Sequence, residues 1–237
     1  MQRKHIFTLG REYAGCGEGP LPFLSNIAGP LGRLQGELHF RMDDFCRIHE
    51  CVYKEIHRID VALDQLNPQP PPACGDMDSP EHHRWARLAN YAIGVDSENR
   101  RIRAYADQMI VVGLWTIAEQ FLGKVYRGFV AFRDSVDENG VNAPYRWDHF
   151  VSSYEQLGID LAALENYANA DECRLVNNAI KHDPVVGSRL QALAFFFPHL
   201  GKDLEALQLD VQRYVNGVSD FLGSLIEKAN ESLDPPP

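Results

Sequence analysis

Apolar residues recur at helical spacing along most of the chain. From about Phe40 to Leu66 they follow a single stripe, made of Phe45, Ile48, Val52, Ile56, Ile59, Leu63 and Leu66. This spacing predicts one long helix. Residues 1–37 are rich in Gly and Pro and show no sustained period. We therefore expect an irregular or weakly helical lead-in before the long helix.

A proline-rich segment, "NPQPPPACGDMDSP" (67–80), follows the first helix. Its prolines remove backbone donors and force extended geometry, so we expect an exposed linker there. Ser79 as N-cap and Pro80 at the first helical position restart the helical pattern. The predicted organisation is a lead-in and long helix packing on the core (1–66), a linker (67–80) and a helical bundle (81–237).

The apolar pattern of the bundle predicts further helices. One runs from roughly Ser97 to Arg133, and a stripe led by Trp147 stops at Gly158. Another runs from about Asp160 to just before Pro184, and an amphipathic helix starts near Val211. No segment alternates convincingly with period two, apart from a weak case in "PVVGSRL", and no repeat has a fixed period. The predicted fold class is therefore all-α, a helical bundle with a long N-terminal helix.

Composition narrows the function classes. The net charge of −10 and pI near 5.3 disfavour a protein that coats nucleic acid. The five cysteines are scattered and odd in number, which favours reduced thiols and a cytoplasmic protein. The start of the chain has no apolar signal segment. The most apolar run, residues 109–118, spans about half a bilayer, so we expect a buried helix and no membrane partner.

Histidines invite a metal hypothesis, which the spacing does not favour. His82 and His83 are adjacent and point about 100° apart on a helix, so they cannot face one ion together. His49 and His57 flank the stripe of the long helix, and we interpret all four as parts of solvated helix faces. No phosphate-binding loop, nucleophile elbow or catalytic-cysteine context occurs. We therefore expect no metal and no cofactor.

The stretch "RLVNNAIKHDP" (174–184) is the most informative for function. Arg174, Asn178 and His182 are spaced i, i+4, i+8, which predicts one polar strip beside the apolar face. Lys181 and His182 also suit the last turn of a helix, and Asp-Pro is a common stop. These capping preferences do not explain Asn177 and Asn178. Each asparagine lowers helix stability by about 0.6 kcal/mol relative to Ala at an interior position. Two such residues suggest a functional site or a partner.

The order of these features resembles the HEPN superfamily, small α-bundles of prokaryotic toxin–antitoxin and phage-defence systems. The resemblance covers roughly residues 97–232: the apolar helix, the helix of "YRWDHFVSSYEQLGIDL", the stretch "ECRLVNNAIKHDP" and the closing amphipathic helix. It implies a four- to five-helix core. It also implies a metal-independent endoribonuclease that leaves 2′,3′-cyclic phosphate ends, and a homodimer or larger assembly that buries part of the helix with Asn178 and His182.

On this resemblance His182 takes the position of the acid/base histidine and Asn178 that of the polar orienting residue. Asn177 stands where the family carries Arg, and Arg174 lies one turn earlier. We therefore expect Arg174 in the catalytic set, with Asn177 and Lys181 binding substrate RNA. The alternative is a non-catalytic HEPN-like module that binds a protein partner, such as a cognate antitoxin or defence protein, or a nucleotide. A bundle unrelated to HEPN is a third hypothesis.

Overall fold

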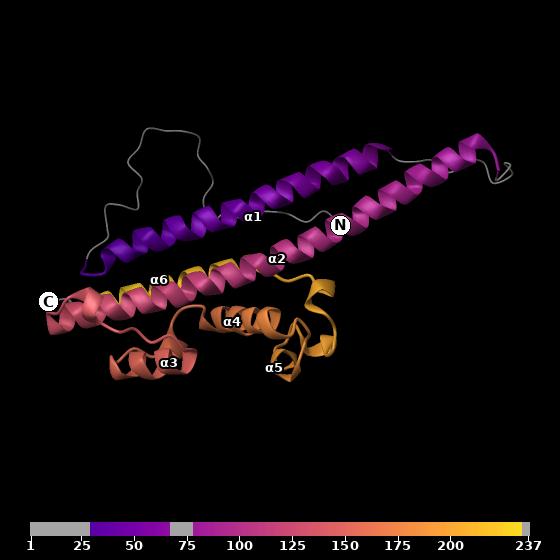
Figure 1. The fold of residues 1–237 in the computed structure, drawn as a ribbon. Coiled ribbons are helices and arrows are strands. Elements are labelled where there is room, and N and C mark those ends of the chain that lie inside the picture. Colours follow the sequence, from indigo (N-terminus) through magenta and orange to yellow (C-terminus); the bar gives the residue numbers. More distant parts are fainter. Residues whose placement is uncertain (1–28, 67–77, 234–237) are drawn as a thin grey trace, which may run out of the picture.

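The computed structural model describes residues 29–66 and 78–233, which form an all-α bundle as predicted. Figure 1 shows its six helices, which are α1 (Gly32–Leu66), α2 (Pro80–Asp134), α3 (Trp147–Gln156), α4 (Tyr167–His182), α5 (Ser188–Gln191) and α6 (Val211–Leu233). Short 3₁₀ turns lie at Glu138–Gly140, Leu161–Ala163, Phe197–His199 and Leu204–Ala206. Within these ranges no strand forms, and the weak alternation after Pro184 yields only an isolated bridge between Val185 and Asp203.

Three predicted helix starts differ from the structure. α1 begins at Gly32, inside the expected lead-in, and the rest of the lead-in falls outside the described residues. The helix expected from Ser97 is the second half of α2, which runs unbroken for 55 residues, about 82 Å. α4 begins at Tyr167, because residues 161–163 form a 3₁₀ turn and Asn166 adopts a left-handed conformation (φ 55°).

The predicted restart of the helix after the linker is confirmed. The Ser79 hydroxyl accepts a hydrogen bond from the His82 backbone N–H at 3.2 Å, and Pro80 opens α2. Residues 67–77 of the predicted linker lie outside the described residues. Asp134 closes α2, and Ser135 caps it in a left-handed conformation (φ 53°).

The hydrophobic core lies in a compact part that we call the head, residues 29–44 and 110–233. There α6 packs against α1, α2 and α4, and both Phe221 and Leu222 are completely buried. The apolar run at 109–118 is mostly buried in α2, as expected, since Val111, Leu114 and Ala118 have no exposed surface, but Met109 at its start is exposed. No described helix has a stretch that is long and apolar enough to cross a membrane.

Beyond the head, α1 and α2 continue side by side as a two-helix extension (Figure 1). We call this extension, residues 45–66 and 80–109, the arm. It joins the head where the Phe45 ring lies over Gly113, and a Cβ atom at Gly113 would come 1.8 Å from the ring. Glycine therefore permits the close approach of the two helices at the root of the arm.

Candidate functional site

The helix α4 carries all five residues that the sequence singles out. Ala170, Cys173 and Val176 on one side of α4 are buried against α2 and α6, which fixes the rotation of the helix. α4 ends at His182, because Asp183 is extended (φ −156°) and Pro184 follows. The C-terminal turn of α4 consequently lies at the surface.

Arg174 is already engaged within the chain. Its Nε donates a hydrogen bond to Asp171 Oδ1 at 2.8 Å, and its guanidinium carbon lies 5.1 Å from the centre of the Trp147 ring. Trp147 is held by edge-on contact with Trp115, at 5.5 Å between ring centres. The charge of Arg174 is therefore balanced by a carboxylate, and its orientation is fixed by an aromatic face.

The two asparagines have different environments. Asn177 is 1% exposed, and its Nδ2 donates to Asn178 Oδ1 at 3.2 Å. Asn177 Oδ1 is buried and has no hydrogen-bond partner among the described residues. Asn178 is exposed, as are Lys181 and His182 one turn later. The structure thus brings Asn178, Lys181 and His182 to one open surface and places the Asn177 side chain inside the bundle.

The surroundings of this surface are electrically balanced. The segment 181–205 contains three Lys or Arg residues and three Asp or Glu residues. The chain after α4 folds back on itself: the Val186 N–H donates to the Lys202 carbonyl, and the Leu204 N–H donates to the Pro184 carbonyl. Lys202 and Asp203 are thereby placed near the end of α4 together. The segment therefore carries no net formal charge that would favour a phosphate backbone.

A buried ionic cluster that the sequence did not reveal joins α4 to α6. Glu172 is 7% exposed and accepts hydrogen bonds from Arg213 Nη1 at 3.1 Å and from the Tyr214 hydroxyl at 2.8 Å. Hydrogen bonding to Glu172 raises the pKa of Arg213, and burial together with this carboxylate raises the pKa of Tyr214. Both partners stay protonated at neutral pH and hold the two helices together.

A second buried polar cluster lies between the helices of the arm. His49 Nε2 is 3.1 Å from Asp107 Oδ1, and the Tyr53 hydroxyl donates to the same oxygen. The sequence placed His49 on a solvated face, and that was wrong, because its side chain is 4% exposed. The described residues contain no group of three side chains suited to bind a metal ion.

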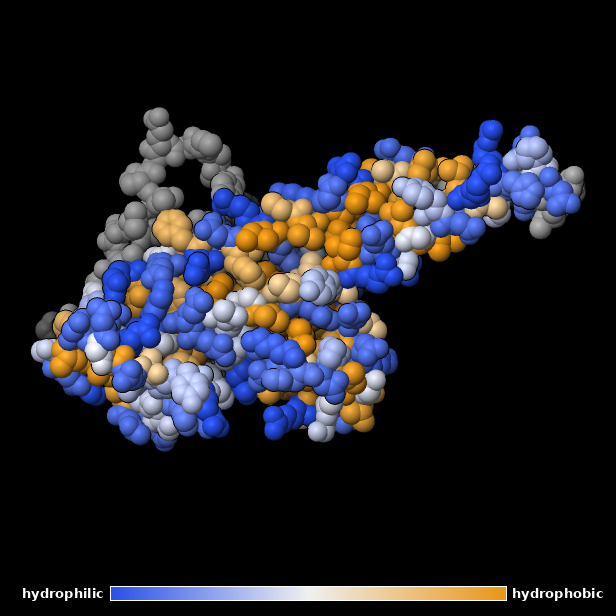
Figure 2. Space-filling view, in the orientation of Figure 1, coloured by the Kyte–Doolittle hydropathy of each residue, from blue (hydrophilic) through white to orange (hydrophobic). Residues whose placement is uncertain are grey.

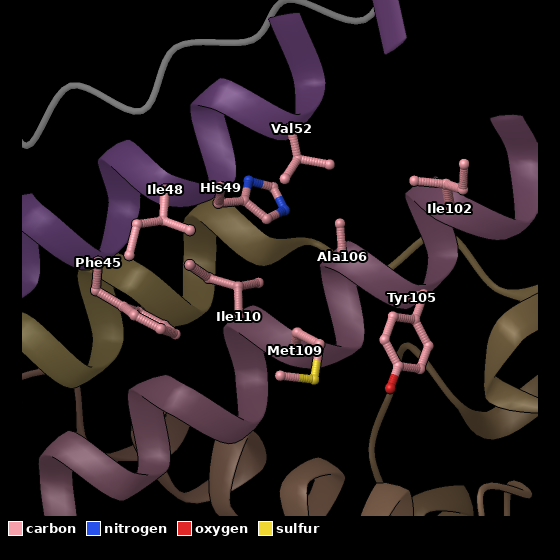
Figure 3. Close-up of a pocket in the computed structure, with 9 residues that line it drawn as sticks. All are labelled: Phe45, Ile48, His49, Val52, Ile102, Tyr105, Ala106, Met109 and Ile110. Carbon is pink, nitrogen blue, oxygen red and sulfur yellow. The ribbon is translucent and has the colours of Figure 1, made fainter. Parts of the chain in front are cut away.

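Beside this polar cluster the arm has an apolar groove with a volume of about 370 Å³. Ile48 and Val52 of α1 line it together with Ile102, Tyr105 and Met109 of α2 (Figure 3). Ile48, Tyr105 and Met109 are each more than half exposed. The apolar stripe of α1 did not predict this groove, because apolar spacing alone predicts that the whole stripe is buried.

The two buried cysteines within the described residues, Cys46 and Cys173, are poorly suited to act as nucleophiles. Burial raises the pKa of Cys46 to about 12, with the Asp43 charge adding to the shift. Cys173 is also buried, and Cys51 is exposed on the arm. A buried thiol with a raised pKa is a poor nucleophile at neutral pH.

Comparison with known proteins adds no relative. No protein family, no curated protein and no solved structure matches the chain. Functional assignment therefore depends on the residues and surfaces of this chain itself.

Proposed function

We propose that the chain is an interaction protein, a HEPN-like helical head with an arm that binds another protein chain. One observation carries the proposal: nine of the sixteen large hydrophobic residues that the structure exposes lie on the arm. These nine are Ile48, Val61, Leu66, Leu88, Tyr91, Ile93, Ile102, Tyr105 and Met109. Apolar surface gathered in one region is typical of a protein-binding site, whereas isolated exposed apolar residues are not.

The surface at the end of α4 supports binding better than catalysis. A metal-independent ribonuclease needs a cation to stabilise the charge that develops on the phosphoryl group, and removing one such donor costs about 3 to 4 kcal/mol. Arg174 is already paired with Asp171 and covered by Trp147. Asn177, at the position of the family arginine, is neutral and buried.

Sedimentation of the full chain at micromolar concentration tests the proposal. We expect the protein to sediment with a molar mass above the 26.8 kDa of one chain, either by itself or when mixed with the products of neighbouring genes. Association through apolar surface persists at high salt, in contrast to association through charges. A monomer in every such mixture would contradict the proposal.

A second candidate function is the RNA cleavage that the HEPN resemblance implies, as in toxin–antitoxin or defence systems. It is favoured by the exposure of Asn178, Lys181 and His182 on one surface. In this hypothesis His182 accepts the proton of a ribose 2′-hydroxyl or delivers one to the leaving 5′-oxygen. Asn178 orients the substrate, and Lys181 contacts the phosphate. Two copies of α4 would meet to complete the site.

Incubation with RNA in the presence of EDTA tests the second candidate. A ribonuclease of this kind leaves 2′,3′-cyclic phosphate ends, and His182→Ala lowers its rate about 10²- to 10⁴-fold. His149→Ala is the matched control, because His149 is also exposed but lies on α3. Intact RNA after incubation with the wild-type chain, alone and with its genomic neighbours, would rule out the ribonuclease.

A further inference from the structure

Six of the nine exposed apolar residues of the arm fall in two rows with the same spacing. In α1 the row is Ile48, Val52, Glu55, Ile59, Ala62 and Leu66. In α2 it is Tyr91, Val95, Glu98, Ile102, Tyr105 and Met109. Both rows advance by steps of 4, 3, 4, 3 and 4 residues, the heptad spacing of helices that pack in coiled coils. Each row contains one glutamate, at its third position.

The two rows share one face of the arm. Ile48 and Val52 line the same groove as Ile102, Tyr105 and Met109 (Figure 3). Figure 2 shows apolar surface extending along the arm beyond the head. The contacts of His49 and Tyr53 with Asp107, and of Asn99 with Asp60, hold α1 to α2. The two rows do not take part in these contacts. Two neighbouring heptad rows are half of a four-helix bundle.

We propose that this face binds the same face of a second copy of the chain, with the two arms antiparallel in a four-helix bundle. The inference rests on the proposed interaction function and names the partner. A two-fold axis across the arms then packs α1 on the partner's α1 and α2 on the partner's α2. Such an interface is self-complementary, as a closed symmetric dimer requires.

The spacing of the rows supports this register. The α1 row is symmetric about residue 57 and the α2 row about residue 100, so Ile48 meets the partner's Leu66 and Tyr91 meets the partner's Met109. Contacts within the arm place the two centres at nearly one level. Asp60 accepts a hydrogen bond from Asn99 Nδ2 at 2.9 Å, and His49 contacts Asp107. One axis therefore serves both pairs of helices.

The charges near the axis are complementary in the antiparallel arrangement. Each row's glutamate is followed three residues later by an arginine, Glu55 by Arg58 and Glu98 by Arg101. Antiparallel pairing about residue 100 places Glu98 within one position of the partner's Arg101. Pairing about residue 57 does the same for Glu55 and the partner's Arg58, and within one chain Glu55 and Arg58 also pair with each other.

The size of the face suits a small specific dimer. Rows of 18 residues on two adjacent helices cover about 27 Å by about 20 Å, a footprint of about 540 Å² per copy. The walls of the groove add accessible area to this flat footprint. The smallest stable interfaces bury about 600 Å² on each partner. A second copy thus supplies an occupant of the right length, shape and charge.

Charge reversal tests the register. We expect Glu98→Arg to place two arginines together and Arg101→Glu to place two glutamates together, each weakening the dimer at least about tenfold. The double variant restores opposite charges, and we expect it to dimerise within about threefold of the wild type. Glu98 and Arg101 form no ion pair in the described part of the chain, so folding is not at stake. Association that ignores all three variants would overturn the inference and leave the interaction function standing.

Disulfide trapping tests the direction of the arms. In a background with Cys16, Cys51 and Cys74 changed to Ser, we expect the double variant Ile48→Cys, Leu66→Cys to form a covalent dimer under mild oxidation. Either single variant lacks the partner thiol and stays uncrosslinked. Positions 48 and 66 lie about 27 Å apart along α1, so no bond forms within one chain. Crosslinking by the single variants, or none by the double variant in a chain that associates, would overturn the antiparallel dimer.

Discussion

The head and the arm use amphipathic helices in opposite ways. In the head, α6 is covered by α1, α2 and α4, and residues such as Val218 and Phe221 have no exposed surface. In the arm, two helices have only each other, and Ile48, Tyr105 and Met109 stay more than half exposed. The head buries most of its apolar helix faces within one chain, whereas the arm leaves apolar residues exposed.

This difference follows from geometry. A helix in a two-helix hairpin buries one stripe, and an apolar row about 100° away from that stripe remains in solvent. The arm fills its inner stripe partly with polar groups: His49 and Tyr53 contact Asp107, and Asn99 contacts Asp60. These polar pairs fix the alignment of the hairpin, while the apolar row outside them favours a further partner.

The largest expected difference between the two regions is in the cost of truncating an aromatic residue. Phe221→Ala in the head should lower the free energy of unfolding by about 3 to 5 kcal/mol, because a closed core leaves a cavity. Tyr105→Ala in the arm should change it by less than about 0.5 kcal/mol when the chain is dilute. Urea unfolding measures both. Equal costs would show that the arm is part of the core.

Removing one carboxylate compares a buried with a partly exposed acidic residue of α4, Glu172 with Asp171. Glu172→Ala should cost about 2 to 3 kcal/mol, because it removes the buried carboxylate that Arg213 and Tyr214 share and, among the described carboxylates, leaves Arg213 only the exposed Asp210 at 3.8 Å. The value falls below that of a fully buried pair, since the Arg213 side chain is 31% exposed. Asp171→Ala, one residue earlier, removes a partly exposed pair and should cost less than about 1 kcal/mol. A reversed order in urea unfolding would contradict the structural role of Glu172.

Two glycines of α2 distinguish the root of the arm from its tip. Gly113→Ala should destabilise the chain by about 1 to 2 kcal/mol, because the new Cβ overlaps the Phe45 ring. Gly94→Ala meets no atom within 4 Å and should stabilise the chain by about 0.5 to 1 kcal/mol. Thermal unfolding measures both shifts. Adding Phe45→Leu should recover much of the loss at Gly113, and no recovery would exclude the overlap as its cause.

The smallest effect is expected at Arg174. Arg174→Lys keeps the charge beside Asp171 but loses the planar contact with Trp147, which should cost about 0.5 kcal/mol. Arg146→Lys, on an exposed pair with Asp148, is the control and should change nothing measurable. A loss above about 2 kcal/mol would mean that Arg174 is part of the core.

The sequence predicted the helical fold well because apolar spacing dominates helix formation, but it missed where tertiary contacts override local signals. Ser97 is a good N-cap residue, yet α2 passes through it without a break. Asn99 nearby is buried and donates to Asp60 of α1, a partner distant in sequence. Asp160 caps a 3₁₀ turn through the Ala162 N–H, so the expected helix begins later, after Asn166.

The sequence also could not separate two rows within one apolar stripe. The predicted stripe of α1 mixes Ile56, which is buried against α2, with Ile48, which is 64% exposed. Which residues face inward depends on where the second helix lies. The same holds for α4, where neighbouring Asn177 and Asn178 differ in burial because the rotation of the helix is set by its apolar contacts.

Hydrogen exchange at several chain concentrations tests the central claim most directly. We expect the amides of the head, such as those around Phe221, to exchange at rates that do not depend on concentration. Amides of the arm, around Ile56 and Ile102, should become more protected as concentration rises, because association stabilises only the bound state. Arm amides that exchange equally at all concentrations, in a chain tested alone and with its genomic partners, would contradict the claim that the arm is completed by another chain.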